Sequence, residues 1–177
     1  LLAAVGDDGR LRICPAGGGS PQVWPVAALP VWQVAFVGDG PLLATCDDDG
    51  QIRFVDRHQG QLAGALASGS KEVHSMAVAP DGTWLIGGTG DGTLKIWDLA
   101  TRQLAHEFRL GTVDAVKCLA ISADGTLVAM GASDYMVRVV RVRRPWAHEW
   151  VLTGQLLDRP QDVAFSADAR RVAGCDK

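Results

Sequence analysis

Short apolar runs alternate with polar turns along the whole chain. Apolar runs of a strand's length begin at Leu1, Leu42, Trp84 and Leu127, and each is followed by a tight turn and a segment of alternating apolar and polar residues. The turns are Asp8-Gly9, Asp49-Gly50, Asp91-Gly92 and Asp134-Tyr135. Asp-Gly between two such runs is a strong hairpin signal, because Gly tolerates the positive φ of the turn. The pattern therefore predicts a hairpin in each of four units.

A second type of hairpin is predicted upstream of the turns at Asp49, Asp91 and Asp134, and once more after the last turn. The aligned segments are VWQVAFVGDGPLLA, VHSMAVAPDGTWLI, VKCLAISADGTLVA and QDVAFSADARRVA. The more polar stretches QLAGALA and QLAHEFRL add a further strand after two of the hairpins. Four strands in a period of roughly 42 residues are typical of β-propeller blades.

The repeat predicts one all-β domain over residues 1–177. We expect four-stranded antiparallel blades, about four of them present, in a larger propeller of about seven blades whose remainder comes from a longer chain or a second chain. The expected repeat units are 1–37, 38–79, 80–122, 123–166 and a partial unit 167–177. A helical fold is disfavoured, because 21 Gly and 8 Pro interrupt every 3.6-residue pattern.

The third unit, PDGTWLIGGTGDGTLKIWDLATRQL, resembles a WD repeat, and Trp97-Asp98 is the dipeptide that names the family. The family's hydrogen-bonded tetrad of His, Ser/Thr, Asp and Trp is matched only by Thr89, Asp91 and Trp97. The dipeptide is replaced in the other units by Cys14-Pro15, Val55-Asp56 and Val140-Arg141. The turn aspartates Asp8, Asp49 and Asp134 complete the set of expected structural residues.

The resemblance also implies a face on which partner proteins dock. In the family this face is built from the loop that leads into the innermost strand and the loop that holds the turn Asp. The matching residues are Trp32, His74, Lys117 and Gln161 near the start of the strand, Pro30, Glu72, Ala115 and Arg159 two residues earlier, and Asp7, Asp48, Gly90 and Ser133 before the turn. Trp32 is either an exposed anchor for a partner or a plug between two blades.

Charge and composition exclude several classes of protein. The 17 basic and 20 acidic residues give a formal charge of −3, which disfavours nucleic acid as a partner. No run approaches the length of a membrane-spanning helix, and no signal peptide is recognisable. Widely spaced cysteines without a C-x-x-C pair predict buried thiols, an intracellular, cytoplasmic location and no zinc site; they are Cys14, Cys46, Cys118 and Cys175.

The motifs that suggest chemistry have simpler explanations. GGTGDGT is followed by a strand, whereas a phosphate-binding loop leads into a helix. Asp47-Asp48-Asp49-Gly50 lacks the spacing of an EF-hand loop, and the four histidines include no H-E-x-x-H pair. We expect solvent exposure for the basic run Arg138, Arg141, Arg143 and Arg144, and packing between blades for Trp24, Trp84, Trp146 and Trp150. No cofactor or metal is expected.

The sequence therefore predicts a non-catalytic scaffold that presents propeller loops to other proteins. One alternative is a ligand-binding or enzymatic propeller that uses its central channel, where the expected inner strands offer only His74, Lys117 and Asp162 as titratable groups. A second alternative is an RNA-binding propeller, for which Lys117 and Arg159 are the available cations on the docking face.

Overall fold

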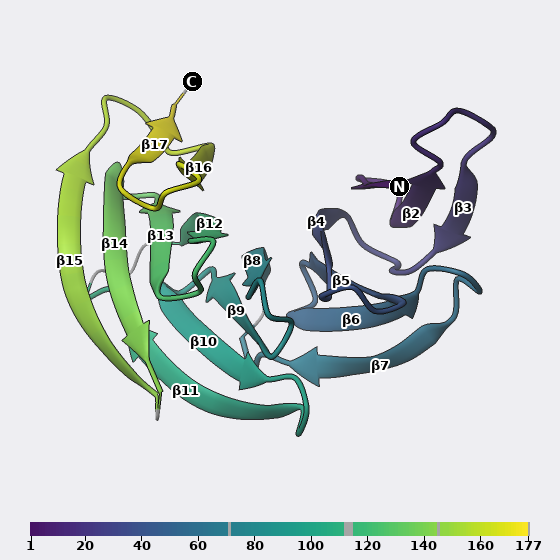
Figure 1. The fold of residues 1–177 in the computed structure, drawn as a ribbon, viewed down its shortest axis with the longest axis horizontal. Coiled ribbons are helices and arrows are strands. Elements are labelled where there is room, and N and C mark those ends of the chain that lie inside the picture. Colours follow the sequence, from purple (N-terminus) through teal and green to yellow (C-terminus); the bar gives the residue numbers. More distant parts are fainter. Residues whose placement is uncertain (71, 112–114, 145, 177) are drawn as a thin grey trace.

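The chain folds into a series of antiparallel β-sheets. The computed structural model describes residues 1–70, 72–111, 115–144 and 146–176, and these form 17 strands in five sheets (Figure 1). The first sheet holds β1 (Leu2–Val5), β2 (Arg10–Cys14) and β3 (Gln22–Pro25). The second holds β4 (Val31–Phe36), β5 (Leu42–Asp47), β6 (Gln51–Asp56) and β7 (Leu62–Ala67).

The remaining sheets repeat this arrangement. The third contains β8 (Val73–Val78), β9 (Trp84–Thr89), β10 (Thr93–Asp98) and β11 (Gln103–Arg109), and the fourth contains β12 (Val116–Ile121), β13 (Leu127–Ala132), β14 (Met136–Arg143) and β15 (Ala147–Gln155). The fifth holds β16 (Asp162–Phe165) and β17 (Val172–Cys175). Within the described residues the fold is thus three complete four-stranded blades flanked by sheets of three and two strands. Each blade takes the number of its sheet, so the complete blades are the second, third and fourth.

The sheets lie along an open arc, with β4, β8, β12 and β16 on its inner side and β7, β11 and β15 on its outer side (Figure 1). The inner strands contact one another in order, β4 against β8, β8 against β12 and β12 against β16. The prediction of an all-β partial propeller with four-stranded antiparallel blades is confirmed. The ring of about seven blades stays a prediction, as do the proposed bounds of the repeat units. Among the described residues, no helix is long and apolar enough to cross a membrane.

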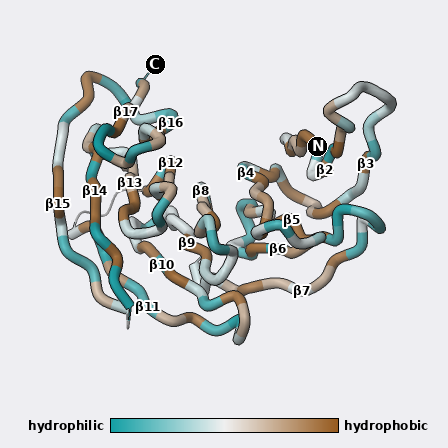
Figure 2. Tube along the Cα trace, viewed as in Figure 1, coloured by the Kyte–Doolittle hydropathy of each residue, from teal (hydrophilic) through white to brown (hydrophobic). Residues whose placement is uncertain are grey.

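Apolar side chains fill the spaces between successive sheets. One buried cluster combines Ile52 and Phe54 of the second sheet with Met76, Leu85 and Trp97 of the third. Similar clusters lie at the other three junctions. The strands of every sheet carry apolar stretches (Figure 2). Because each sheet buries side chains on the faces that meet its neighbours, the blades stabilise one another although the family's tetrad is incomplete.

The hairpin turns require a left-handed backbone. Gly9, Gly50 and Gly92 have φ values of 68°, 76° and 76°, and Tyr135 occupies the same place in the fourth blade with φ 65°. The carbonyl of this residue accepts a hydrogen bond from the chain that follows the outer strand, as in Ser68 N to Gly50 O at 3.0 Å. Tyr135 therefore carries backbone strain at a position where its equivalents are glycine.

Ion pairs replace the family's tetrad in three of the four turns. Asp8, Asp49 and Asp134 each accept hydrogen bonds from the arginine four residues later, namely Arg12, Arg53 and Arg138. In the third blade Thr89 is buried and donates from Oγ1 to Asp91 Oδ1 at 2.5 Å, as the resemblance predicts for this pair. Asp98 accepts hydrogen bonds from Thr101 in the turn after β10.

Arg138→Met is expected to lower the free energy of unfolding by about 2 kcal/mol, because the side chains of the Arg138–Asp134 pair are only 12% and 13% exposed and the variant removes the positive charge from a largely buried ion pair. The matched control is Arg12→Met, where the pair with Asp8 is 39% and 43% exposed and is screened by solvent. Urea unfolding measures both losses. Equal losses in the two variants would contradict a role for burial.

Some sequence expectations about burial were wrong. Cys46 and Cys118 are buried, and burial raises the pKa values of these thiols to about 12 and about 11. Cys14 is half-buried, however, and Cys175 is exposed. Arg138 is not a solvated residue of the basic run, since it is paired with Asp134.

The other arginines of that run lie closer to the surface. Arg141 and Arg143 both approach Glu149, at 3.3 and 3.5 Å, and the Arg144 guanidinium lies 5.1 Å from the centre of the Trp146 ring. Of the tryptophans expected between blades, Trp84 is buried and meets Trp146 edge to face, and Trp24 is half-buried. Trp150 contacts Phe108 of the neighbouring blade but remains 43% exposed.

Candidate functional site

The starts of the inner strands bring together residues from two blades. Trp32 on β4 is 48% exposed, and its indole Nε1 donates a hydrogen bond to Asp48 Oδ1 at 2.6 Å. Its ring meets the ring of His74 on β8 edge to face, with ring centroids 6.1 Å apart. Trp32 therefore lies at the surface, fixed from one side by a carboxylate and from the other by an imidazole.

His74 extends this contact across the third blade. Its Nε2 lies 3.0 Å from Glu72 Oε2. Burial lowers the pKa of His74, and the charge of Lys117 on the next inner strand lowers it further, while Glu72 and Asp48 oppose these effects. Trp32, Asp48, His74 and Glu72 form a continuous chain of contacts, which we call the Trp32 cluster.

Two hollows lie near the starts of the inner strands. The first includes Glu72 of the Trp32 cluster, and the second includes Lys117 on β12. One, of about 410 Å³, is lined by Gly69, Ser70, Glu72, Gly90 and Asp91. Its shape depends on Gly90, because a Cβ there would lie 2.8 Å from Glu72 Oε2. The other, of about 470 Å³, is lined by Lys117, Asp158, Arg159, Pro160 and Gln161.

The structure does not gather all the predicted docking residues into one group. Lys117, Arg159 and Gln161 belong to the second hollow and Gly90 to the first. Asp7 is exposed on the turn of the first sheet, and Pro30 is half-buried before β4. Ser133 and Ala115 are half-buried and are joined by a backbone hydrogen bond from Ser133 N to Ala115 O of 3.0 Å. The predicted docking residues therefore fall into separate groups, of which the Trp32 cluster is joined by side-chain contacts between two blades.

The acidic stretch Asp47–Asp49 beside this cluster is paired with an arginine of the same blade, Arg53. Asp47 is 2% exposed, and both Asp47 and Asp49 accept hydrogen bonds from Arg53. Burial raises the pKa of Asp47 to about 6. Burial also opposes ionisation of Asp49, but hydrogen bonds with Arg53, Asp47 and the Gln51 amide together outweigh it and hold that pKa at about 2. Asp47 and Asp49 thus bind Arg53 within the turn, whereas Asp48 accepts the hydrogen bond from Trp32.

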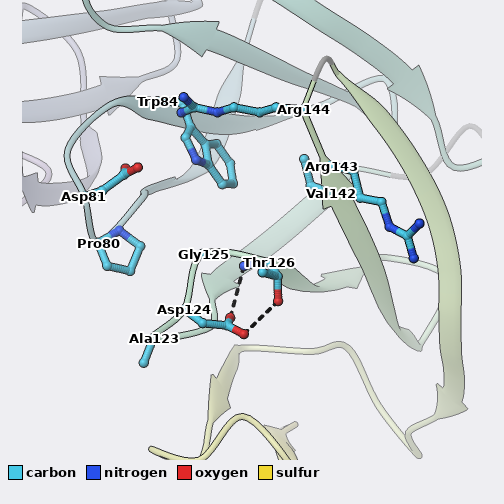
Figure 3. A pocket seen from close by; sticks show the side chains of 10 residues that line it. All are labelled: Pro80, Asp81, Trp84, Ala123, Asp124, Gly125, Thr126, Val142, Arg143 and Arg144. Atoms are coloured by element: carbon cyan, nitrogen blue, oxygen red, sulfur yellow. Dashed lines mark hydrogen bonds between the residues drawn. The ribbon is translucent and has the colours of Figure 1, made fainter.

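A larger hollow, which the sequence analysis did not identify, lies where the inner strands of the third and fourth blades end. It measures about 730 Å³ and is lined by Pro80, Asp81, Trp84, Ala123, Asp124, Gly125, Thr126, Val142, Arg143 and Arg144 (Figure 3). Asp124 accepts hydrogen bonds from the Thr126 amide and hydroxyl, and Asp81 does the same for Thr83. The hydrogen bond from the Ser122 hydroxyl, followed by those from Thr126, lowers the pKa of Asp124, and the hydrogen bonds from Thr83 lower the pKa of Asp81. The repeated segments PDGT and ADGT were the available sequence signal.

A histidine pair lies on the outer side of the arc and was also missed. His106 on β11 and His148 on β15 face each other, with Nε2 and Nδ1 3.3 Å apart. Burial lowers the pKa of His148, and the neighbouring His106 lowers it further. The sequence signal was present, because the tripeptide Ala-His-Glu occurs at 105–107 and again 42 residues later at 147–149.

Comparison with known proteins matches this fold to one family. The model of the family described as WD domain, G-beta repeat, matches residues 24–56, 60–98 and 103–140, which is more than half of the chain. The chain is 34% identical over 112 residues to a WD repeat-containing protein, SL1-17, of Schistosoma mansoni, with 63% of this chain and 36% of that protein covered.

Other relatives are larger proteins. WD repeat-containing protein 1 of Xenopus tropicalis is 39% identical over 83 residues, covering 45% of this chain and 14% of its own length. Actin-interacting protein 1 of Drosophila melanogaster is 28% identical over 116 residues, covering 59% of this chain and 19% of its own length. The chain thus spans about a third or less of these relatives. Its repeats, strand order and family match together show that the chain belongs to the WD-repeat family.

Proposed function

We propose that the chain is a non-catalytic scaffold that binds partner proteins through the loops at the start of the inner strands. The observation that carries this proposal is Trp32, which is half exposed and yet held by Asp48 and His74. Tryptophan is enriched among the residues that dominate interface energy, and a side chain ordered before binding loses less entropy on association. The Drosophila relative, actin-interacting protein 1, is named for its interaction with another protein.

The inner strands offer little support for catalysis. Their titratable side chains include His74, Lys117 and Asp162, and His74 is already engaged by Glu72. A general acid or base works when it can reach a reacting group in a site that excludes water. The larger hollow in Figure 3 has carboxylates, but these hold their own turns. A channel-based enzyme is therefore the weaker proposal.

An RNA-binding role also has less support. Lys117 and Arg159 lie at one hollow together with Asp158, and the Trp32 cluster contributes Asp48 and Glu72. Nucleic-acid surfaces carry an excess of cations that contact phosphates. The mixed charge of this face favours a protein surface of mixed charge as the partner.

Trp32→Ala is expected to weaken partner binding by about 2 kcal/mol, or about 30-fold, because it removes the central exposed anchor. Thermal stability should change by less than about 1 kcal/mol, as is usual for surface positions. The matched control is Trp150→Ala, since Trp150 is 43% exposed but lies on an outer strand. A photo-crosslinking residue in place of exposed Leu29, just before β4, or of exposed Leu152 on β15 keeps both tryptophans of the complete protein, identifies the bound proteins and supplies partners for affinity measurements.

Two results would count against the proposal. If Trp32→Ala unfolds the domain, the indole is a structural plug rather than an anchor. If both tryptophan variants weaken the same partner equally, docking is not confined to the inner-strand loops. Asp48→Lys provides a second test, because it removes the acceptor of the indole N–H and should weaken the same partner.

A further inference from the structure

The outer strands of two neighbouring blades place two imidazoles face to face. His106 Nε2 on β11 and His148 Nδ1 on β15 are 3.3 Å apart, and their ring centroids are 5.5 Å apart. The His148 ring is stacked on Phe108, with centroids 4.1 Å apart and planes 16° from parallel. Trp150 meets His148 edge to face at 6.1 Å. The position of His148 is therefore set by packing as well as by its contact with His106.

The separation of the two nitrogens suits a bound metal ion. A distance of 3.3 Å is longer than the usual range of hydrogen bonds donated by N–H groups, so little is lost if that contact is replaced. Two nitrogen ligands about 2.0–2.1 Å from a tetrahedral Zn²⁺ ion lie about 3.3–3.4 Å apart. An ion could therefore be accepted by a tilt of the two rings, without movement of the strands.

Access and selectivity follow from the surroundings. His148 is exposed and His106 is half-buried, so an ion can approach from solvent. Among the described residues, no third His, Cys, Asp or Glu completes a metal cluster. Glu107 is engaged by Lys95, and Glu149 by Arg141. The other coordination positions would belong to water, and imidazole ligands favour zinc, nickel or copper over magnesium or calcium.

We propose that His106 and His148 bind a divalent transition-metal ion and that this ion links the outer strands of the third and fourth blades. Each strand supplies one ligand, so the site exists only when the two blades are packed together. Binding to the folded state alone stabilises that state in proportion to the metal concentration. The ion would act as a removable link between two blades rather than as a catalyst.

Calorimetric titration of the complete, untagged protein with Zn²⁺ tests the proposal. We expect one bound ion and a loss of affinity of about tenfold or more in His106→Gln and in His148→Gln, because glutamine is polar but lacks an imidazole nitrogen. The double variant, which keeps neither imidazole, should bind at least as weakly as the weaker single variant. The matched control is His58→Gln, which changes an exposed histidine in the turn after β6 and should bind zinc as the unmodified protein does.

A second measurement needs no variant. Chemical modification of histidine by diethyl pyrocarbonate, followed by mass spectrometry, should show that Zn²⁺ protects His106 and His148 but not His58. Zinc affinity weaker than about 1 mM overturns the proposal. Unchanged affinity in both glutamine variants, or equal protection of His58, also overturns it.

Discussion

Gly50→Ala is expected to lower the free energy of unfolding by about 3 kcal/mol or more, which would be among the largest effects of a single added methyl group in this chain. The residue has φ 76°, and a Cβ at this position would lie 1.9 Å from the carbonyl oxygen of Ser70. The loop after β7 crosses the turn here, and backbone atoms on both sides cannot move independently. Urea unfolding of the complete protein measures the loss.

The matched control is Gly18→Ala. Gly18 also has a positive φ, 90°, but no atom lies within 4 Å of its added Cβ, so this variant has the backbone strain without the clash. A loss of about 1 kcal/mol is expected for strain alone. If the two variants lose equal stability, the close approach of the loop to the turn is not a determinant of the fold. Gly50→Ala should also weaken partner binding, because the same turn carries Asp48.

Trp97→Ala is expected to lower the free energy of unfolding by about 3–5 kcal/mol. Trp97 is 2% exposed and belongs to the cluster that joins the second and third sheets. Its ring covers Gly87, where an added Cβ would lie 3.0 Å from Trp97 Cζ3 and 3.3 Å from Ile52 Cδ1. Truncation would leave a cavity between two blades whose rigid backbones cannot close it.

The residue that occupies the place of Trp97 in the fourth blade, Val140, provides the control for this prediction. Val140 replaces the family's tryptophan in the fourth blade and is fully buried. Val140→Ala removes fewer atoms and should cost less than Trp97→Ala, with both losses measured by urea unfolding. A larger loss for Val140→Ala would show that the fourth blade, not the one with the family's dipeptide, determines stability.

The sequence was sufficient to predict the architecture because the turns and apolar runs are local signals. Asp-Gly turns between alternating segments specify hairpins, and their recurrence specifies blades. The ion pairs that replace the tetrad were also visible in principle, since Asp8, Asp49 and Asp134 are each followed four residues later by arginine. Their burial was not visible, because it depends on how the next blade covers each turn.

The candidate site was less accessible to sequence analysis. The resemblance to the family selected Trp32 and His74 near the starts of two strands and Asp48 in a turn, as three separate positions. Their contacts depend on the angle between neighbouring blades, which no local pattern contains. The exposure of Trp150, which contacts Phe108 of the neighbouring blade, was unpredictable for the same reason. The His106–His148 contact required two strands 42 residues apart to be in register across a blade junction.

The succession of sheets along the arc has a mechanical consequence. The main contacts between sheets join blades that follow each other in the chain, such as β4 with β8 and β8 with β12. A force applied across these sheets is carried by all the junctions in series, so the weakest junction should open first and the blades should detach one after another. A record of extension against force would show successive steps of about one blade each, and a zinc-loaded junction between the third and fourth blades should release at a higher force.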